Sequence, residues 1–345
     1  MGLIVAVYIL FAVISIINLI WIPRPKNQSE ICFEVVVPAR NEAKNLPLLI
    51  PKLVSSGVRV TVLDDQSNDA TADIARELGA TVISITEDLP AGWTGKNRAC
   101  DRLSKVSSAS WTVFLDADTR PSEGFASELS GYLSSCKDDV VSGFTKLIPG
   151  RGLEPLYLGW VPWILLATNP FGLVALTNRG HNRFTNGQFT AWRTPFLKEF
   201  RPYERVRGEI LEDVKIGRLL AQEGHAVRVI NVSEILGVEM YKTTREAFDG
   251  MSKNSADIAG SSVGTIFLAL FLLFIAWGWV FLGKFTILCY SLLLLSKFVA
   301  DRVVKAPLWT APLIPITITG ASITLIRSLI WKKRGVTKWK GRIYP

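Results

Sequence analysis

Long uncharged segments stand at both ends of this chain, and a more polar middle part separates them. Residues 1–23 hold no charged side chain, and residues 258–283 form a second uncharged block. Residues 306–326 nearly reach the length of a span, and residues 285–296 are shorter. Because a transmembrane helix needs about 20 apolar residues, the pattern predicts an N-terminal anchor at 1–23 and C-terminal transmembrane helices within 258–331.

The N-terminal block is predicted to remain on the protein as an anchor. It lacks the basic start and the Ala-x-Ala site of a cleaved signal peptide, and Arg24 and Lys26 follow it directly. Because basic residues favour the cytoplasmic side, residues 33–257 are expected in the cytoplasm, on a multi-pass protein of the plasma membrane. The basic tail at 332–345 is also expected to be cytoplasmic, although three C-terminal spans would place it outside.

Between the apolar ends, strand and helix patterns alternate. Short β-branched runs at 33–37, 58–63, 81–85 and 111–115 are separated by helical patterns at 43–56, 70–78 and 96–106. This βαβαβαβ order predicts an α/β domain with a mostly parallel sheet and helices on both faces. Ligands bind such sheets at the carboxyl ends of the strands.

The uncharged segment 155–178 lies inside the predicted catalytic domain at 33–257. Its length would allow a span, but a single span would separate the acidic motifs before and after it. It also holds three prolines, together with Tyr157, Trp160 and Trp163, and tyrosine and tryptophan favour the membrane interface. The segment is therefore predicted to lie in the interface.

Composition excludes some classes of function. Six charges of the net +9 come from the tail, and no basic stripe with interleaved aromatics marks the middle part, which argues against nucleic-acid binding. The four scattered cysteines fit a reducing compartment. Two histidines are too few for a histidine-based metal site.

The motif Asp116-Ala117-Asp118 follows the apolar strand pattern at 111–115. Such triplets are common in loops, but two carboxylates at a strand end can share one hard divalent cation, Mg²⁺ or Mn²⁺, which then neutralises a diphosphate. Asp116 and Asp118 are the predicted metal ligands.

The pair Glu212-Asp213 opens a helical pattern at 214–222. It can supply a catalytic base, or it can be a solvated helix start, where acidic residues favour the helix dipole. As a base, Asp213 is expected to have a pKa lowered by that dipole and to stay ionised.

Two further polar sites accompany predicted elements. Asp64 and Asp65 end a predicted strand, and two adjacent acids at this place suit hydrogen bonds to a uracil or to ribose hydroxyls. Asp69 or Asn68 can instead be explained as the cap of the following helix. Lys96 is either a surface lysine or a phosphate contact.

These motifs occur in the order found in a known family. The run VVVPARNE at 35–42, the acidic pair at 64–65, the triplet at 116–118 and the pair at 212–213 together resemble family 2 inverting glycosyltransferases of the GT-A (Rossmann-like) fold. The runs GWTGKN at 92–97, NGQ at 186–188 and WKGR at 339–342 resemble the membrane-bound branch related to carotenoid-acid (diaponeurosporenoate) and hopanoid-associated glycosyltransferases. The Gln-x-x-Arg-Trp motif of processive synthases does not occur. RGE at 207–209 replaces a Gly-Gly-His-like stretch, which leaves the acceptor site open.

The resemblance implies a UDP-sugar donor and a metal-dependent hexosyl transfer to a membrane lipid of the carotenoid or hopanoid type. Asp65 would hold the uridine, Asp116 and Asp118 the metal, and Asp213 with Glu212 would act on the acceptor. The remaining donor-site residues would be Pro38, Ala39, Asn41, Glu42, Asp64, Ser67, Lys96, Asp116 and Gly187.

Two other functions stay open at this point. One is a polyprenyl-phosphate sugar synthase, whose acceptor is a phosphate. The basic residues Arg179 and Arg183 and the basic tail favour this alternative. The other is a membrane scaffold or transporter, which intramembrane ionisable residues would favour. Lys297 and Arg327 are expected near span ends, where they can reach the interface, and this argues against transport.

Overall fold

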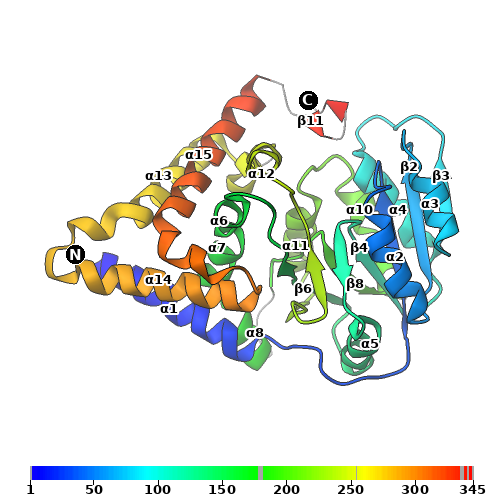
Figure 1. Ribbon diagram of the computed structural model, residues 1–345, viewed down its shortest axis with the longest axis horizontal. Helices are drawn as coiled ribbons and strands as arrows, with labels where there is room; N and C mark the ends of the chain where they lie inside the picture. The colour runs from blue at the N-terminus through cyan, green and yellow to red at the C-terminus, as the bar shows by residue number, and fades with distance from the viewer. Residues whose placement is uncertain (1, 178–181, 254, 335–337, 340–341, 344–345) are drawn as a thin grey trace. The chain divides into compact units, whose positions relative to one another are not determined.

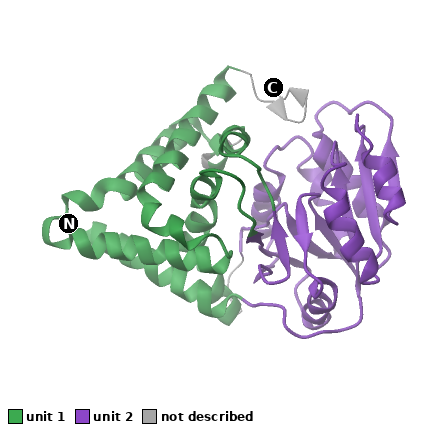
Figure 2. Cartoon of the chain, in the orientation of Figure 1, with its two compact units in different colours: residues 1–22, 147–178, 239–345 green, residues 23–146, 179–238 purple. Residues whose placement is uncertain are grey.

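The computed structural model describes residues 2–177, 182–253, 255–334, 338–339 and 342–343. Of the positions named above or covered by the ranges above, Asn178, Arg179, Lys340 and Gly341 lie outside the described residues. The chain divides into two compact units (Figures 1 and 2). We call residues 23–146 and 179–238 the sheet unit, and residues 1–22, 147–178 and 239–345 the helical unit.

The sheet unit is built on a seven-stranded sheet in the order β3-β2-β1-β4-β8-β6-β9 (Figure 1). Its first four strands in that order are parallel, β8 is antiparallel to both of its neighbours, and β6 is parallel to β9. The strands are β1 (Phe33–Ala39), β2 (Val60–Asp65), β3 (Thr81–Ile85), β4 (Trp111–Leu115), β6 (Val140–Phe144), β8 (Phe189–Arg193) and β9 (Val227–Asn231). The predicted mostly parallel sheet is confirmed.

Helices cover both faces of this sheet. Side chains alternate along β1, so Val35 and Val37 pack with Leu49 of α2, whereas Val36 packs with Leu103 of α4 on the opposite face. The strands are apolar throughout because both of their faces are buried. Helices therefore cover each face, and one hydrophobic cluster lies on either side of the sheet. The helices are α2 (Leu46–Ser55), α3 (Thr71–Glu77), α4 (Gly95–Val106), α5 (Phe125–Ser135), α9 (Thr194–Phe200), α10 (Pro202–Arg205) and α11 (Glu212–Gln222). A small sheet joins β5 (Thr119–Pro121), β10 (Leu236–Val238) and β7 (Lys146–Leu147). This arrangement is GT-A-like.

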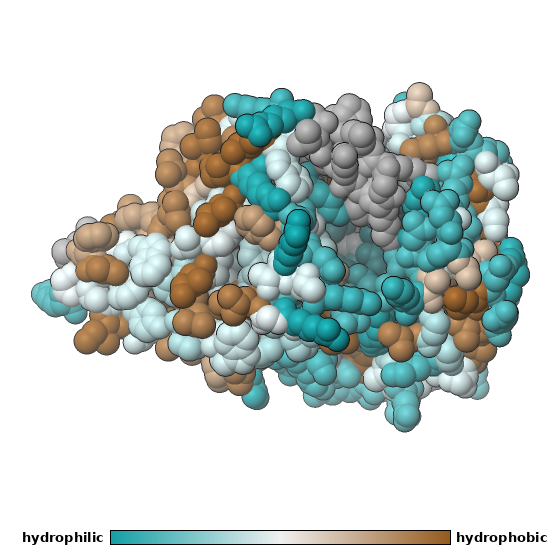
Figure 3. Space-filling view, turned by 45° about the horizontal axis from the view of Figure 1, so that its top comes forward, coloured by the Kyte–Doolittle hydropathy of each residue, from teal (hydrophilic) through white to brown (hydrophobic). Residues whose placement is uncertain are grey.

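Among its described residues, the helical unit contains five segments that are long and apolar enough to cross a membrane: 2–21, 154–177, 262–281, 283–303 and 308–333. Apolar side chains gather on the outer surface over these helices (Figure 3). One of them, Phe267, is 70% exposed. The helices are α1 (Gly2–Trp21), α6 (Glu154–Leu158), α7 (Trp160–Thr168), α8 (Phe171–Thr177), α12 (Thr244–Ser252), α13 (Ser262–Trp277), α14 (Thr286–Val303) and α15 (Ile314–Lys333). Short 3-10 turns occupy Ser255–Ala259, Gly278–Phe281, Gly283–Phe285 and Leu308–Leu313, and β11 (Lys338–Trp339) pairs with β12 (Arg342–Ile343).

Segment 154–177 is not one helix. Helices α6, α7 and α8 are interrupted at Gly159 and around Asn169. The second interruption is held by Asn18 of α1, whose Nδ2 donates to the carbonyls of Leu166 and Asn169, both at 2.8 Å, and whose Oδ1 accepts from the Gly172 N–H. These bonds satisfy main-chain groups that the interruption of the helix leaves without a helical partner.

Helix α14 is longer than the short apolar block at 285–296 predicted. It continues past Lys297, which is fully buried and paired with Asp301 one turn later. Thr310 accepts from Lys297 at 3.1 Å and donates to Asp301 at 3.0 Å. The expectation that Lys297 reaches an interface is therefore wrong, because an internal carboxylate satisfies its charge. Arg327 pairs with Asp249 at 2.6 Å.

Candidate active site

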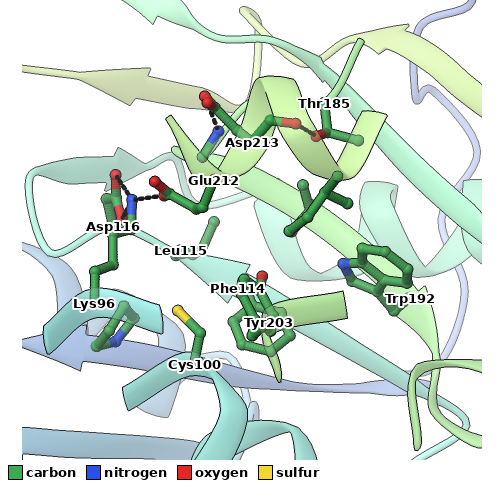
Figure 4. Close-up of a pocket in the computed structure, with 14 residues that line it drawn as sticks. Lys96, Cys100, Phe114, Leu115, Asp116, Thr185, Trp192, Tyr203, Glu212 and Asp213 are labelled. Atoms are coloured by element: carbon green, nitrogen blue, oxygen red, sulfur yellow. Dashed lines mark hydrogen bonds and ion pairs between the residues drawn. The ribbon is translucent and has the colours of Figure 1, made fainter. Parts of the chain in front are cut away.

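A cavity of about 350 Å³, including its open mouth, lies at the carboxyl ends of β1 and β4 in the sheet unit (Figure 4). It is lined by Pro38, Lys96, Cys100, Phe114, Leu115, Asp116, Thr185, Gly187, Thr190, Trp192, Tyr203, Glu212, Asp213 and Ile216. The position follows from the parallel strands, whose carboxyl ends share one edge. Six of the predicted site residues meet here: Pro38, Lys96, Asp116, Gly187, Glu212 and Asp213.

Lys96 joins the two acidic motifs. Its Nζ lies 3.0 Å from Asp116 Oδ1 and 2.8 Å from Glu212 Oε1 (Figure 4). Helix α4 begins one residue earlier, and Thr94 caps it by accepting the Asn97 N–H at 3.2 Å. Burial alone would lower the pKa of Lys96, but the carboxylates of Asp116 and Glu212 outweigh burial and hold that pKa well above its usual value. Lys96 is therefore a permanent cation of the site and not a surface lysine.

Asp213 is oriented by the main chain. Its Oδ2 accepts the Gly187 N–H at 3.1 Å and its Oδ1 accepts the Val214 N–H at 2.8 Å. Thr185 donates its hydroxyl to the Asp213 carbonyl at 2.6 Å. A Cβ on Gly187 would lie 3.1 Å from Lys96 Nζ, so a larger residue here would press on the lysine.

The predicted low pKa of Asp213 is wrong. Burial raises the pKa of this carboxyl, and Lys96 together with the N–H groups of Val214 and Gly187 offsets the rise only in part. Burial likewise raises the pKa of Glu212, against the opposing effect of Lys96. The loss of water around two neighbouring carboxylates outweighs the helix dipole, and a raised pKa suits a group that must accept a proton.

The acidic residues of the cavity fit a divalent cation. Asp116 and Glu212 share one ammonium, Asp213 adds a third carboxyl group to the cavity, and Asp118 is half-buried in the turn between β4 and β5. The acidic groups therefore outnumber the one lysine of the cavity. Over the part of the chain that the structure describes, no three His, Cys, Asp or Glu side chains could hold a metal by themselves. Mg²⁺ and Mn²⁺ take one or two carboxylates and complete their shell with phosphate oxygens and water, so Asp116 and Asp118 fit this role.

The loops after β1 and β2 are fastened to each other. Asn41 donates its N–H to Ser67 Oγ at 2.9 Å, and its Oδ1 accepts from the Asn68 N–H at 2.8 Å. Asn41 has a φ of 56°, a left-handed conformation that asparagine tolerates. Asp64 Oδ1 accepts from the Ser67 N–H at 3.3 Å. The structure thus brings together the two segments from which a nucleotide site was predicted.

Asp65 is more enclosed than the sequence suggests. Its side chain is buried and its Oδ1 accepts from Arg98 at 2.5 Å, while Arg40 donates to its carbonyl at 2.7 Å. Arg98 also donates to the carbonyls of Glu87 and Asp88. Arg98 was not among the predicted site residues, because a position two residues after Lys96 on a helix faces another side of that helix. Several predicted donor residues do not line the described cavity: Ala39, Asn41, Glu42, Asp64, Asp65, Ser67 and Asp118.

The inner wall of the cavity was also missed. Cys100 and Tyr203 are buried beside Lys96, and burial raises the pKa of each well above its usual value. Neither group is therefore ionised near neutral pH. Cys100 follows Lys96 by one helical turn, which is the one local signal that could have indicated it. Trp192 and Tyr203 come from distant segments and have no such signal.

Comparisons with known proteins show which families and structures this chain resembles. Residues 34–195 match the family "Glycosyl transferase family 2". The chain is 24% identical over 352 residues to 4,4'-diaponeurosporenoate glycosyltransferase of Staphylococcus aureus strain USA300, which covers 90% of this chain and 87% of that protein. The enzyme of the same name from Staphylococcus haemolyticus is 45% identical over 87 residues, 24% of this chain and 23% of that protein.

Among solved structures, S. aureus TarS 1–349 is similar at 17% identity, with 88% of this chain and 91% of that chain covered and a TM-score of 0.42. Glucosyl-3-phosphoglycerate synthase from Mycobacterium tuberculosis, in complex with Mn²⁺, UDP and glucosyl-3-phosphoglycerate, is similar at 22% identity, with coverages of 67% and 80% and a TM-score of 0.43.

The sheet order and the acidic cavity at its carboxyl edge give the sheet unit a GT-A-like arrangement. Over residues 34–195 the chain is similar to glycosyltransferase family 2, and over most of its length it resembles 4,4'-diaponeurosporenoate glycosyltransferase. The pair Glu212-Asp213 lies beyond the matched range, so its place in the site rests on the structure.

Proposed function

We propose that this protein transfers a hexose from a UDP-hexose to a membrane lipid, an isoprenoid of the carotenoid or hopanoid type, with inversion at the anomeric carbon. The observation that carries the proposal is the Lys96 bridge, which joins the strand-end acid Asp116 to the helix-start acid Glu212 in one cavity. In the proposed reaction the donor diphosphate lies on the Asp116 side of this bridge, and the acceptor lies on the side of Glu212 and Asp213. The bridge holds the two sides close enough for transfer.

On the donor side, Asp116 and Asp118 would hold Mg²⁺ or Mn²⁺, which when bound neutralises charge on the leaving diphosphate. Lys96 adds a fixed positive charge beside it. The fastened loops that contain Asn41 and Asp64 would hold the nucleoside. The other residues of this donor site would be Pro38, Ala39, Glu42, Asp65, Ser67 and Gly187.

On the acceptor side, Asp213 would take the proton of an acceptor hydroxyl while the acceptor oxygen attacks the anomeric carbon. The bond from that carbon to the diphosphate breaks, and UDP leaves with the bonding electrons. The Gly187 N–H keeps the carboxylate in place. If the acceptor is a carboxylate it arrives ionised, and Asp213 then orients it.

A lipid acceptor is supported by the helical unit. Its five apolar segments and their outward-facing apolar side chains suit a bilayer. The sequence similarity to enzymes named for diaponeurosporenoate points the same way. We place the sheet unit in the cytoplasm beneath the plasma membrane.

The direct test compares lipid extracts from cells with and without the protein by mass spectrometry. We expect lipids heavier by one hexose only where the protein is present, and membranes supplied with labelled UDP-hexose should label the same species. A labelled polyprenyl phosphate would instead identify a polyprenyl-phosphate sugar synthase. No labelled lipid with any UDP-hexose would contradict the proposal.

The proposed topology can be tested with a membrane-impermeant thiol reagent. Glu123 and Glu234 are exposed, and they flank segment 154–177 in the chain. In a variant without the four native cysteines, Glu123→Cys and Glu234→Cys should both stay unlabelled in intact cells and become labelled after permeabilisation. Labelling of only one in intact cells would mean that the segment between them crosses the membrane.

A further inference from the structure

Asn97 ties together two segments of the sheet unit that lie 109 to 112 residues apart. Its side chain is fully buried, and its Nδ2 donates to the carbonyls of Val206 at 2.8 Å, Arg207 at 3.1 Å and Glu209 at 2.9 Å. Within the described residues nothing donates a hydrogen bond to Asn97 Oδ1. The side chain therefore acts only as a donor, and its targets are all main-chain atoms of one loop.

Main-chain contacts reinforce this junction. The Thr94 N–H donates to the Arg207 carbonyl at 2.8 Å. A Cβ on Gly208 would lie 3.1 Å from the Gly92 carbonyl oxygen, so the two backbones touch. The run GWTGKN at 92–97 is thus bound along its length to the loop at 206–211.

That loop leads directly into α11, whose first two residues are Glu212 and Asp213. The neighbouring residue of Asn97, Lys96, contacts Asp116 and Glu212. The first turn of α4 therefore has two roles. Asn97 holds the loop before Glu212 and Asp213, and Lys96 places its positive charge between Glu212 and Asp116. Asn97 itself does not line the described cavity.

We propose that Asn97 is a positioning residue for the transfer reaction, an inference that rests on the function proposed above. By binding the loop at 206–211, it sets where the carboxylates of Glu212 and Asp213 stand relative to Lys96 and Asp116. Without Asn97 the Glu209 carbonyl would lose its donor, and the Val206 and Arg207 carbonyls would each keep only a main-chain N–H, that of Glu209 and that of Thr94. The loop would then be held less firmly, because buried polar groups need partners. A displacement of about 1 Å in a reacting group can lower a rate by about 10²-fold.

The test variant is Asn97→Asp, which keeps the size of the side chain and replaces its NH₂ with an oxygen that repels the three carbonyls. We expect turnover to fall by about 10²-fold, while the KM for the donor and the affinity for UDP, measured by titration, stay near the wild-type values. Hydrogen exchange should become faster at the amides of residues 206–213 and remain unchanged in β1 and β4.

A second variant and a control complete the experiment. Gly208→Ala places a methyl group against the Gly92 carbonyl and so disturbs the same junction from the loop side. It should give the same pattern with a smaller loss of turnover. This variant tests the proposal if Asn97→Asp does not fold. The control is Thr112→Ala, which removes another fully buried hydrogen bond, the one to Thr194 at 2.9 Å, on β4. It should leave turnover and the exchange of residues 206–213 unchanged.

Turnover of Asn97→Asp and Gly208→Ala equal to that of Thr112→Ala would overturn the positioning role while the proposed function stands. Loss of UDP binding in a folded Asn97→Asp protein would also overturn it, because the residue would then support the donor side. A wild-type protein that neither binds UDP nor transfers sugar would overturn the proposed function and this inference together.

Discussion

Asp213→Asn should lower turnover with a hydroxyl acceptor by about 10²–10⁴-fold and leave the affinity for UDP almost unchanged. The amide keeps an oxygen for the Gly187 N–H, so the site should stay assembled, but it cannot accept the acceptor proton. With a carboxylate or phosphate acceptor the loss should be much smaller, because no proton has to be removed. Turnover at saturating donor and UDP titration are the measurements, and they also separate the acceptor classes.

The pH dependence follows from the raised pKa of Asp213. The base works only when ionised, so turnover should fall as the pH drops through a value above that of an ordinary aspartate, which is about 3.9. Asp213→Asn should remove this fall in turnover at low pH, the acidic limb of the pH profile.

A matched control for this variant is Asp138→Asn, which breaks the 2.6 Å pair with Arg228 outside the cavity. It should leave the acidic limb and the turnover in place. If Asp213→Asn abolishes UDP binding, the residue belongs to the donor side and the assignment of the base fails.

Asp116→Asn and Asp118→Asn should each remove most of the transfer activity, by about 10²–10³-fold, as expected when one charge-stabilising group is lost. EDTA should have the same effect on the wild-type protein, and added Mg²⁺ or Mn²⁺ should restore it. Titration of Mn²⁺ in the presence of UDP should show weaker metal binding in both variants.

The change in metal binding separates this role from damage to the fold. Asp116 also contacts Lys96, so Asp116→Asn alone could act through the lysine, whereas Asp118→Asn tests the metal more directly. Asp138→Asn again serves as the control and should bind Mn²⁺ like the wild type. Full activity of the wild-type protein in metal-free buffer would overturn the metal role.

Local patterns were sufficient for the first half of the sheet unit. The predicted strand at 81–85 agrees with β3 and the one at 111–115 with β4, and the predicted helix at 96–106 begins one residue late. Such patterns succeed because a strand buried on both faces is apolar throughout, and because a helix start needs its own capping residue. Strands β6, β8 and β9 were not predicted, and the antiparallel course of β8 depends on its two neighbours.

The sequence by itself determined which chemical groups are available: the strand-end acids at 116 and 118, the helix-start acids at 212 and 213, and the apolar ends. Only the tertiary structure decided how they act. Lys96 joins Asp116 to Glu212, which lie 96 positions apart in the sequence, and burial reverses the pKa shift that the local helix dipole predicts for Asp213. The same holds for Lys297, whose partner Asp301 and burial keep it from the interface. Charge and hydrogen bonding depend on which distant groups are brought close and on how much water is removed, and neither quantity is encoded in the spacing of residues along the chain.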